Sequence, residues 1–220
     1  MKYHIDFDLD FKRNTSPGKF IAIEGIDGSG KTTQANRLKD ILSKKTSVFL
    51  TKQPTDGPIG KFIRQVISGE LKLPPVSFQY LFAADRQVHQ VEVLKQLEGG
   101  KTVITDRYFW SAIAYGLYER GSRNFEKDGK QLLVSLSLLS MYHQFVIPDA
   151  TFYLDISAET AMKRVSKMKK ELELYEKKEA LNHVRRAYRW IIDIFDKENI
   201  VVIDGEQPVD KVTEEILRHL

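Results

Sequence analysis

Cysteine is missing from this chain of 220 residues, so disulfide bonds and thiolate metal sites are excluded. An apolar run long enough to cross a bilayer is missing too. The first residues, MKYHIDFDLDFKRN, carry three aspartates where a signal peptide needs an apolar segment. The histidines show no spacing typical of metal ligands. From these absences we expect a cytoplasmic protein without a membrane partner.

An excess of one charge is almost absent as well. Lysine and arginine number 34 against 30 aspartate and glutamate residues, which gives a net charge of +4. That surplus suits small anionic ligands, but it is too small to predict a nucleic-acid partner. The hydrophobic share of 42% and the charged share of 29% are typical of a globular protein, and the length suits one α/β domain with a substantial core.

What the chain does contain is a regular alternation of strand and helix patterns. Runs that are apolar on both faces, as in strands buried between helices, occur at residues 19–24, 47–52, 102–106, 150–155 and 200–204. Helical patterns occur at residues 31–44, 58–69, 76–98, 108–122, 128–146, 157–170, 176–196 and 208–219. The alternation predicts an α/β fold with a five-stranded parallel sheet flanked by helices on both faces. Ligands of such sheets bind beyond the carboxyl ends of the strands.

Residues 1–18 fall outside this alternation. Tyr3, Ile5 and Phe7 alternate with polar residues, and the pattern continues through Phe11 until NTSPG interrupts it. Alternation with a period of two is typical of a half-buried strand. We therefore expect an N-terminal extension over residues 1–18, forming an extra edge strand or a packed arm, ahead of a single domain over residues 19–220.

A glycine-rich motif follows the first predicted strand. Residues 25–32 read GIDGSGKT and match G-x-x-x-x-G-K-[ST]. The glycines allow a tight turn whose N–H groups point inward as an anion nest, and the next helix adds its positive end. Lys31 can reach the β- and γ-phosphates of a nucleotide such as ATP. The predicted ATP-binding residues are Gly25, Ile26, Asp27, Gly28, Ser29, Gly30, Lys31, Thr32 and Thr33.

A magnesium ion is expected beside this motif. The Thr32 hydroxyl is placed to bind Mg²⁺, which also prefers carboxylates and water. Asp106 ends the third predicted strand, at the same edge of the sheet, and is the expected second ligand. Asp155 and Asp204 also end strands, but loop or helix-capping roles are more typical of them.

Cations and aromatic rings are predicted near the same strand ends. FQYLFAADRQVHQ places Phe82, Arg86 and His89 at i, i+4 and i+7 on one helical face. DRYFWSAIAYG places Arg107 four residues before Ser111. Each of these side chains alone could serve packing or surface pairing. Together, beside the glycine-rich motif, they favour a ligand that has both an aromatic base and a phosphate.

The motifs FIAIEGIDGSGKTTQ, PTDGPIGKFIRQVI, LFAADRQVH, DRYFWSAIAYG and PDATFYLDISAETAMKR, in this order, resemble the thymidylate kinase family. The resemblance covers about residues 19–220. It implies a P-loop nucleoside monophosphate kinase fold, with ATP and Mg²⁺ as cofactors and thymidylate (dTMP) as the phosphoryl acceptor. It also implies a homodimer formed through the helices near residues 60–96, and no nucleic-acid or membrane partner.

The resemblance assigns roles on the side of the thymine base. It implies that Phe82 stacks on thymine and that Arg86 reads the edge of the base. Ser111 is implied to lie near the base. Tyr115 is implied to lie against the sugar, where a 2′-hydroxyl would project.

The resemblance also assigns roles around the reacting phosphates. Arg107 is implied to grip the acceptor phosphate, Asp27 to approach the deoxyribose 3′-hydroxyl, and Arg64 to lie on the phosphate side. The implied catalytic residues are Lys31, Asp27, Asp106 and Arg107. A lid segment is expected over about residues 163–176, with Arg164, Lys167 and Lys170 as its candidate phosphate contacts.

Gln53 departs from the family pattern, because many members have a glutamate at this position. Related deoxynucleoside kinases use a glutamate there to activate a hydroxyl acceptor, and an amide cannot take up a proton. Gln53 therefore favours an anionic acceptor, a nucleoside monophosphate. Two alternatives stay open from the sequence: a kinase for another monophosphate or a deoxynucleoside, and a nucleotide-binding module that transfers nothing.

Overall fold

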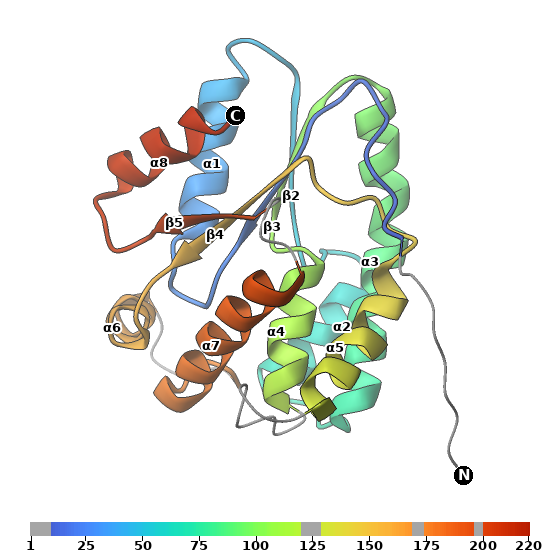
Figure 1. The fold of residues 1–220 in the computed structure, drawn as a ribbon, viewed down its shortest axis with the longest axis vertical. Helices are drawn as coiled ribbons and strands as arrows, with labels where there is room; N and C mark the ends of the chain where they lie inside the picture. The colour runs from blue at the N-terminus through green and yellow to red at the C-terminus, as the bar shows by residue number, and fades with distance from the viewer. Residues whose placement is uncertain (1–9, 120–128, 169–173, 196–199) are drawn as a thin grey trace.

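A computed structural model describes residues 10–119, 129–168, 174–195 and 200–220 (Figure 1). Its centre is a parallel sheet in the order β2-β3-β1-β4-β5. The strands are β1 (Phe20–Glu24), β2 (Val48–Lys52), β3 (Thr102–Asp106), β4 (Ala150–Asp155) and β5 (Ile200–Asp204). The predicted five-stranded α/β fold is confirmed, and each strand lies within one residue of its predicted bounds.

Helices cover both faces of this sheet. They are α1 (Lys31–Leu42), α2 (Pro58–Ile67), α3 (Pro75–Glu98), α4 (Phe109–Glu119), α5 (Gly129–Tyr142), α6 (Ala158–Met168), α7 (Lys178–Phe195) and α8 (Val209–Arg218). Figure 1 shows α1 and α8 together on one side of the sheet, and α2 to α5 with α7 on the other. Asp27 and Arg107, which follow β1 and β3, line one cavity together with residues of α2, α3 and α4.

The predicted helix over 128–146 is too long by one turn, since α5 ends at Tyr142. Phe145 and Val146 leave the helix and are buried in the core. The backbone N–H of Val146 donates to the Gln90 side chain at 3.3 Å, and Val146 pairs with Lys12 in an isolated parallel bridge. Burial of these two apolar side chains therefore ends the helix earlier than the local pattern indicates.

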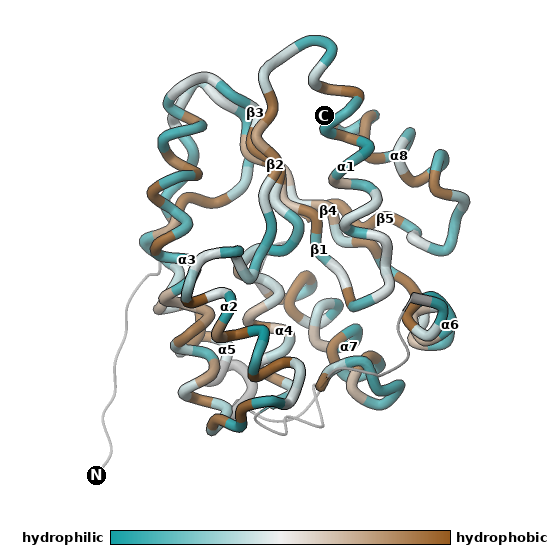
Figure 2. The backbone as a smooth tube through the Cα atoms, turned by 180° about the vertical axis from the view of Figure 1, so that it is seen from behind, coloured by the Kyte–Doolittle hydropathy of each residue, from teal (hydrophilic) through white to brown (hydrophobic). Residues whose placement is uncertain are grey.

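Strand β1 supplies both halves of the core. Ile21 and Ile23 face α1 and α8 in the smaller hydrophobic cluster, and Phe20 and Ala22 face the opposite layer in the larger one. Such alternation explains why the strand is apolar throughout, since it is buried on both sides. Figure 2, coloured by residue hydropathy, accordingly shows hydrophobic residues along the central strands.

The predicted N-terminal strand lies mostly outside the described residues, which begin at residue 10. In the described part, the Phe11 ring stacks on Phe109 at a centroid distance of 5.9 Å. The Lys12 carbonyl accepts a hydrogen bond from the Ile147 N–H at 2.8 Å. This segment thus packs along the larger cluster. In the part of the chain that the structure describes, no helix has the length and apolar character needed to cross a membrane.

Candidate active site

The turn between β1 and α1 is shaped by glycines at positions that reject other residues. Gly28 and Gly30 have positive φ angles of 79° and 96°, which side chains other than glycine rarely adopt. A Cβ on Gly28 would also lie 2.8 Å from the Ala161 carbonyl oxygen. Gly30 precedes the first turn of α1, whose unpaired N–H groups and positive dipole end favour an anion. The turn over residues 25–30, called here the phosphate turn, therefore has the geometry expected from its sequence.

Lys31 lies folded against the phosphate turn. Its Nζ atom donates to the Ile26 carbonyl at 2.9 Å, and its side chain is buried. Burial, together with the neighbouring charge of Arg107, lowers the pKa of Lys31 to about 8. Asp27 and Asp106 act in the opposite direction. The ammonium is thus held at the site, but with a smaller margin of protonation than a solvent-exposed lysine has.

Thr32 and Asp106 lie next to each other where α1 begins and β3 ends. The Thr32 hydroxyl donates to one carboxylate oxygen of Asp106, so the two predicted magnesium ligands are brought together. Hard oxygen donors of this kind fit Mg²⁺, which keeps several waters and is completed by substrate phosphates. No group of three or more acidic or histidine ligands occurs among the described residues, so a fully protein-built metal cage is not found there.

Arg107 sits in an unusual backbone conformation directly after β3. It is the only non-glycine residue with a positive φ, 71°, among those described. Its guanidinium donates to both the Asp27 carboxylate and the Tyr115 hydroxyl, the latter at 3.2 Å, and to the Gly25 carbonyl at 3.1 Å. Strain of this kind persists where surrounding contacts over-determine it, which is typical of functional sites.

The charges of Arg107 and Asp27 hold each other in place. Burial raises the pKa of Asp27, but Arg107 and Lys31 outweigh it, so the pKa lies below its usual value. Burial likewise lowers the pKa of Arg107, and the Asp27 carboxylate outweighs that and raises it. Both groups are therefore ionised at neutral pH, and a guanidinium is available beside the phosphate turn.

Glu24, at the end of β1, is a site residue that the sequence analysis missed. It is buried and accepts hydrogen bonds from the Tyr108 N–H at 2.9 Å, the Ser111 hydroxyl at 2.5 Å and the Tyr188 hydroxyl at 2.8 Å. Burial raises its pKa. Ser111 in turn accepts a hydrogen bond from Arg107 at 3.2 Å. Glu24 thus fixes the start of α4 and, through Ser111, the guanidinium.

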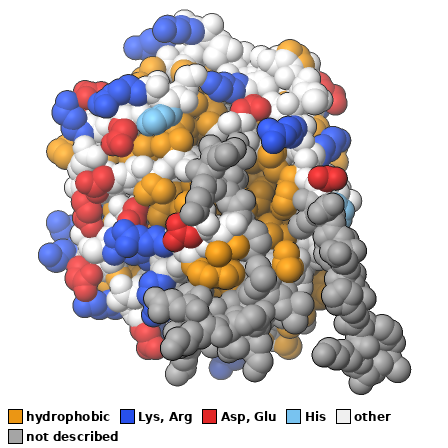
Figure 3. Space-filling view, viewed as in Figure 1, with side chains coloured by type: hydrophobic (Ala, Val, Ile, Leu, Met, Phe, Trp, Pro, Cys, Tyr) orange, Lys and Arg blue, Asp and Glu red, His pale blue; other side chains and the backbone are white. Residues whose placement is uncertain are grey.

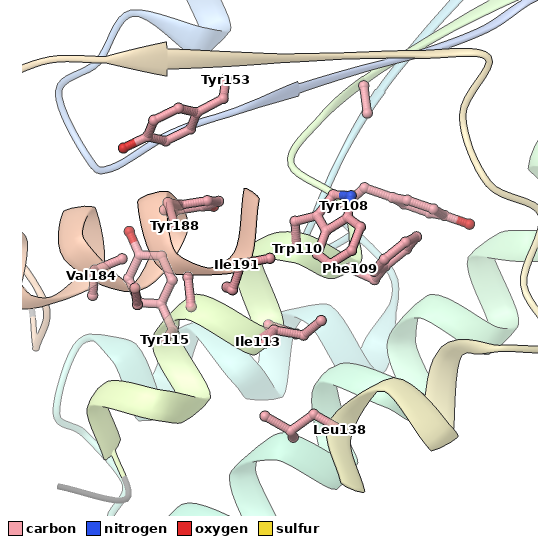
Figure 4. Packing of buried hydrophobic residues seen from close by; sticks show 14 of the residues in the cluster. Tyr108, Phe109, Trp110, Ile113, Tyr115, Leu138, Tyr153, Val184, Tyr188 and Ile191 are labelled. Atoms are coloured by element: carbon pink, nitrogen blue, oxygen red, sulfur yellow. The ribbon is translucent and has the colours of Figure 1, made fainter. Parts of the chain in front are cut away.

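Aromatic packing between α4, α7 and β4 supports this network. Figure 4 shows Tyr115 and Tyr188 on neighbouring faces of α4 and α7, with Tyr153 of β4 above them. The Tyr153 and Tyr188 rings stack at a centroid distance of 4.8 Å. The Tyr115 hydroxyl donates to Asp27 at 2.8 Å. Tyr115 therefore positions the Asp27–Arg107 pair as well as lining the site.

A cavity of about 610 Å³ opens beside Arg107, and we call it the acceptor cavity. It is lined by Asp27, Thr32, Lys52, Gln53, Pro54, Arg64, Gln65, Ile67, Ser68, Glu70, Gln79, Phe82, Arg86, Arg107, Ser111, Ala112, Tyr115, Tyr175 and Glu176. All the predicted acceptor-side residues are in this set. Tyr175 and Glu176, which fall within the expected lid segment but lack a motif of their own, also line the cavity.

Arg86 is buried in the wall of the acceptor cavity. Its Nε donates to the side-chain amide oxygen of Gln53 at 2.5 Å, and its Nη2 donates to the backbone carbonyl of Tyr108 at 3.2 Å. Because the Gln53 oxygen faces Arg86, its amide nitrogen faces His89 Nδ1, at 3.0 Å. His89 Nε2 lies 2.7 Å from the Thr51 hydroxyl. Gln53 thus supports Arg86 in this structure and is not aimed at an acceptor as a base would be.

The remaining predicted residues contact other parts of the site or are exposed. Arg64 donates to the Pro54 and Thr55 carbonyls at 3.0 and 2.7 Å and is only half-buried. Arg164 connects the phosphate turn to the loop after β5, with bonds to the carbonyls of Gly28 at 3.4 Å and Gly205 at 3.1 Å. Lys167 is exposed in the last turn of α6, and Lys170 lies outside the described residues.

A phosphate turn after β1, paired with a separate cavity lined by aromatic rings and three arginines, defines a P-loop nucleoside monophosphate kinase. The family model for thymidylate kinase matches residues 23–216. The chain belongs to the thymidylate kinase family, whose activity is phosphorylation of thymidylate.

Relatives agree with this assignment over nearly the whole chain. A probable thymidylate kinase of Methanocaldococcus jannaschii is 35% identical over 202 residues, which cover 91% of this chain and 95% of that protein. A probable thymidylate kinase of Picrophilus torridus is 37% identical over 205 residues, with 91% and 95% covered. A solved thymidylate kinase from Candida albicans, described as having broad substrate specificity, superposes with a TM-score of 0.79 at 29% identity and covers 94% of this chain and 92% of that one.

Proposed function

We propose that the protein transfers the γ-phosphoryl group of ATP directly to a phosphate oxygen of thymidylate. The bond from the γ-phosphorus to its bridging oxygen breaks, and ADP leaves with that electron pair. The thymidylate oxygen forms the new bond to phosphorus, giving thymidine diphosphate. The observation that carries the proposal is the position of Arg107, whose guanidinium lines the acceptor cavity and contacts the phosphate turn through Gly25.

The phosphate turn and Lys31 hold the donor in this proposal. Backbone N–H groups at the start of α1 neutralise the triphosphate, and Lys31 supplies a point charge to its β- and γ-phosphates. The hydrogen bond between Thr32 and Asp106 places two oxygen ligands side by side, which supports magnesium binding by these residues. Magnesium would neutralise charge on the bridging and terminal phosphate oxygens. Arg164, which contacts Gly28, belongs to the donor side.

Arg107 neutralises the acceptor. Two phosphate groups repel each other at contact distance, and a guanidinium can bind the acceptor phosphate with two parallel N–H donors. Asp27 keeps Arg107 charged and oriented before substrate arrives. No general base is required, because the acceptor oxygen carries negative charge at neutral pH. Gln53 supports this scheme, since its amide cannot accept a proton.

Phe82 and Arg86 recognise the base in this proposal. Phe82 is partly buried, leans on Phe78 at a centroid distance of 4.8 Å, and lines the acceptor cavity. A base can stack on a ring held in this way. Tyr115, fixed to Asp27, narrows the cavity at the sugar. Tyr175 and Glu176, which precede α7, line the cavity and support a lid that excludes water during transfer.

A coupled assay of ADP release tests the proposal. The assay would compare thymidylate with other deoxynucleoside and ribonucleoside monophosphates, thymidine and water as acceptors, each with ATP and Mg²⁺. We expect thymidylate to give the highest kcat/KM, thymidine to be inactive, and ATP hydrolysis without acceptor to be slow. Equal and negligible rates with every acceptor would rule out the kinase and favour a nucleotide-binding module.

A homodimer is part of this proposal. Large apolar side chains are exposed on α2 and α3, namely Phe62, Val76, Tyr80, Val88 and Val91. On α3, Tyr80, Val88 and Val91 fall on one side of the helix, and Val91 is 70% exposed. Such a surface is typical of an interface. Sedimentation should give a dimer, and Val91→Glu should shift it toward the monomer; a monomeric wild-type protein at micromolar concentration would contradict this part.

A further inference from the structure

Two residues that line the acceptor cavity each have one buried polar atom without a hydrogen-bond partner. One is Nη1 of Arg86, a donor, and the other is Oε1 of Gln79, an acceptor. Each side chain is only 2% exposed. An unpaired buried polar atom destabilises the folded protein, so such atoms need an explanation. Neither atom has a partner within the part of the chain that the structure describes.

The orientation of the Gln79 amide is fixed by its other end. Its nitrogen, Nε2, donates to a Glu119 carboxylate oxygen at 2.9 Å. The second oxygen of Glu119 accepts from the Tyr175 hydroxyl, so that carboxylate is held in turn. A flipped amide would place two acceptor oxygens against each other. The Gln79 carbonyl oxygen is therefore kept turned away from Glu119 and unpaired.

Space for the Gln79 side chain is provided by Gly116. A Cβ on Gly116 would lie 3.3 Å from Gln79 Cδ and 2.7 Å from Leu138 Cδ1. A larger residue at position 116 would therefore displace the amide. The absence of a side chain on this turn of α4 lets an α3 side chain fill the same wall of the cavity.

Gln79, Phe82 and Arg86 lie on one face of α3. They are spaced i, i+3 and i+7, the spacing that aligns side chains along a helix. A ring for stacking is therefore flanked by a fixed acceptor on one side and a fixed donor on the other. A planar ligand bound on Phe82 with an N–H and a carbonyl oxygen on its edge would satisfy both unpaired atoms.

We propose that Gln79 determines base specificity by accepting a hydrogen bond from the ring N3–H of a thymine or uracil base, while Arg86 donates to a carbonyl oxygen of the same ring. This inference rests on the proposed function and names a further substrate contact within it. It predicts that a pyrimidine without the ring N–H is bound poorly because the Gln79 oxygen then stays unpaired.

The test compares thymidylate with N3-methylthymidylate in the wild-type protein and in Gln79→Met. Methionine keeps the length of the side chain and removes the amide. In the wild type, methylation should lower kcat/KM at least tenfold. In Gln79→Met, kcat/KM for thymidylate should fall about tenfold, chiefly through KM, and the value for the methylated substrate should change less than twofold. Glu119→Gln lets the Gln79 amide turn over, so it should reduce discrimination against the methylated substrate in the same direction as Gln79→Met.

Equal losses for the two substrates in Gln79→Met would overturn the proposal, because a purely structural role affects both alike. Should that variant fail to fold, Gln79→Asn, which withdraws the oxygen and keeps an amide, carries the same comparison. Wild-type turnover of thymidylate tests the proposed function separately. Normal turnover with no discrimination against the methylated base would refute the role of Gln79 and leave the kinase activity intact.

Discussion

The donor and acceptor sides of the site are built in different ways. The donor side is built mainly on one continuous segment, residues 25–33, which acts largely through backbone N–H groups, and Asp106 and Arg164 join it from elsewhere in the chain. The acceptor cavity draws its wall from β2, α2, α3, α4 and the residues before α7. A backbone turn needs glycines and little else, whereas a wall of side chains needs each one to be held by further residues.

The two sides also differ in the buried residues that support them. The acceptor side depends on buried groups that touch no reacting atom in our proposal, such as Glu24 behind Ser111 and Gln53 behind Arg86. The donor side has few such supports, because a helix dipole and amides are part of the chain itself. Substitutions on the acceptor side should therefore change turnover and acceptor KM at constant ATP affinity.

The largest effect is expected for Arg107→Ala. Its removal takes away the cation between two phosphates and leaves Asp27 without its partner, so kcat should fall about 10³-fold or more. Binding of a non-hydrolysable ATP analogue should change less than about threefold, which titration calorimetry can measure. Arg107→Lys keeps the charge without the fork and should give an intermediate rate. An equal loss of analogue binding in the alanine variant would show that Arg107 contributes to binding of ATP and would contradict its role toward the acceptor.

Glu24→Gln should destabilise the fold and slow turnover. An amide keeps one oxygen that can still accept from the Tyr108 N–H, but its NH2 group then faces the hydroxyls of Ser111 and Tyr188, which lose their acceptor. At least one buried donor is then unpaired, at a cost of about 1–3 kcal/mol in the free energy of unfolding. Urea unfolding measures this cost. Tyr188→Phe removes one donor and leaves the carboxylate satisfied, so a loss as large as that of Glu24→Gln would argue against a central role for Glu24.

The same comparison explains how much the sequence could predict. The strands and the phosphate turn follow from local patterns, because β propensity, glycine positions and helix starts act over a few neighbouring residues. Phe82, Arg86 and Arg107 could be found because their motifs are local as well. In the sequence, Glu24 is simply the last residue of an apolar strand pattern. Its hydrogen-bond partners are 84 to 164 residues away along the chain. Only the packing of α4 and α7 on the sheet brings those partners together.

Phe82→Ala should weaken binding of thymidylate. Loss of a stacked ring costs about 1–3 kcal/mol per base, so KM should rise at least fivefold with kcat changed much less. Steady-state kinetics with thymidylate varied at saturating ATP provide the measurement. Phe49→Ala removes a partly buried ring of β2 that is not part of the cavity lining, and it is the matched aromatic control. An unchanged KM in Phe82→Ala would assign that ring to the core alone.

ATP binding should weaken above neutral pH because of Lys31. Burial lowers its pKa to about 8 in the free protein, so the ammonium needed by the triphosphate is lost as pH rises through that value. The dissociation constant of an ATP analogue should rise about fourfold between about pH 7 and about pH 8.5. Lys31→Arg, which stays protonated, should bind with little pH dependence over that range. A flat profile in the wild type would contradict the lowered pKa.

The smallest effect on KM is expected for substitution of His89. This residue contacts Gln53, which in turn contacts Arg86, the residue proposed to recognise the base. Burial lowers the pKa of His89 to about 4, so the ring is neutral and Nδ1 can accept from the Gln53 amide. His89→Phe removes that acceptor and lets the Gln53 amide turn over. The amide nitrogen would then oppose the Nε of Arg86, a residue that lines the acceptor cavity.

For His89→Phe we expect KM for thymidylate to rise about two- to threefold at constant kcat, the size of a disturbed neutral hydrogen bond. His89→Asn offers a carbonyl oxygen near the Nδ1 position and should restore part of the affinity. A merely structural histidine would give equal losses in both variants and would lower kcat or stability along with KM. Partial recovery in the asparagine variant therefore separates control of Arg86 through Gln53 from simple packing. It would also show that the acceptor side depends on a residue that acts on the ligand only through Gln53 and Arg86. The phosphate turn differs in this respect, because it binds the donor through its own backbone N–H groups.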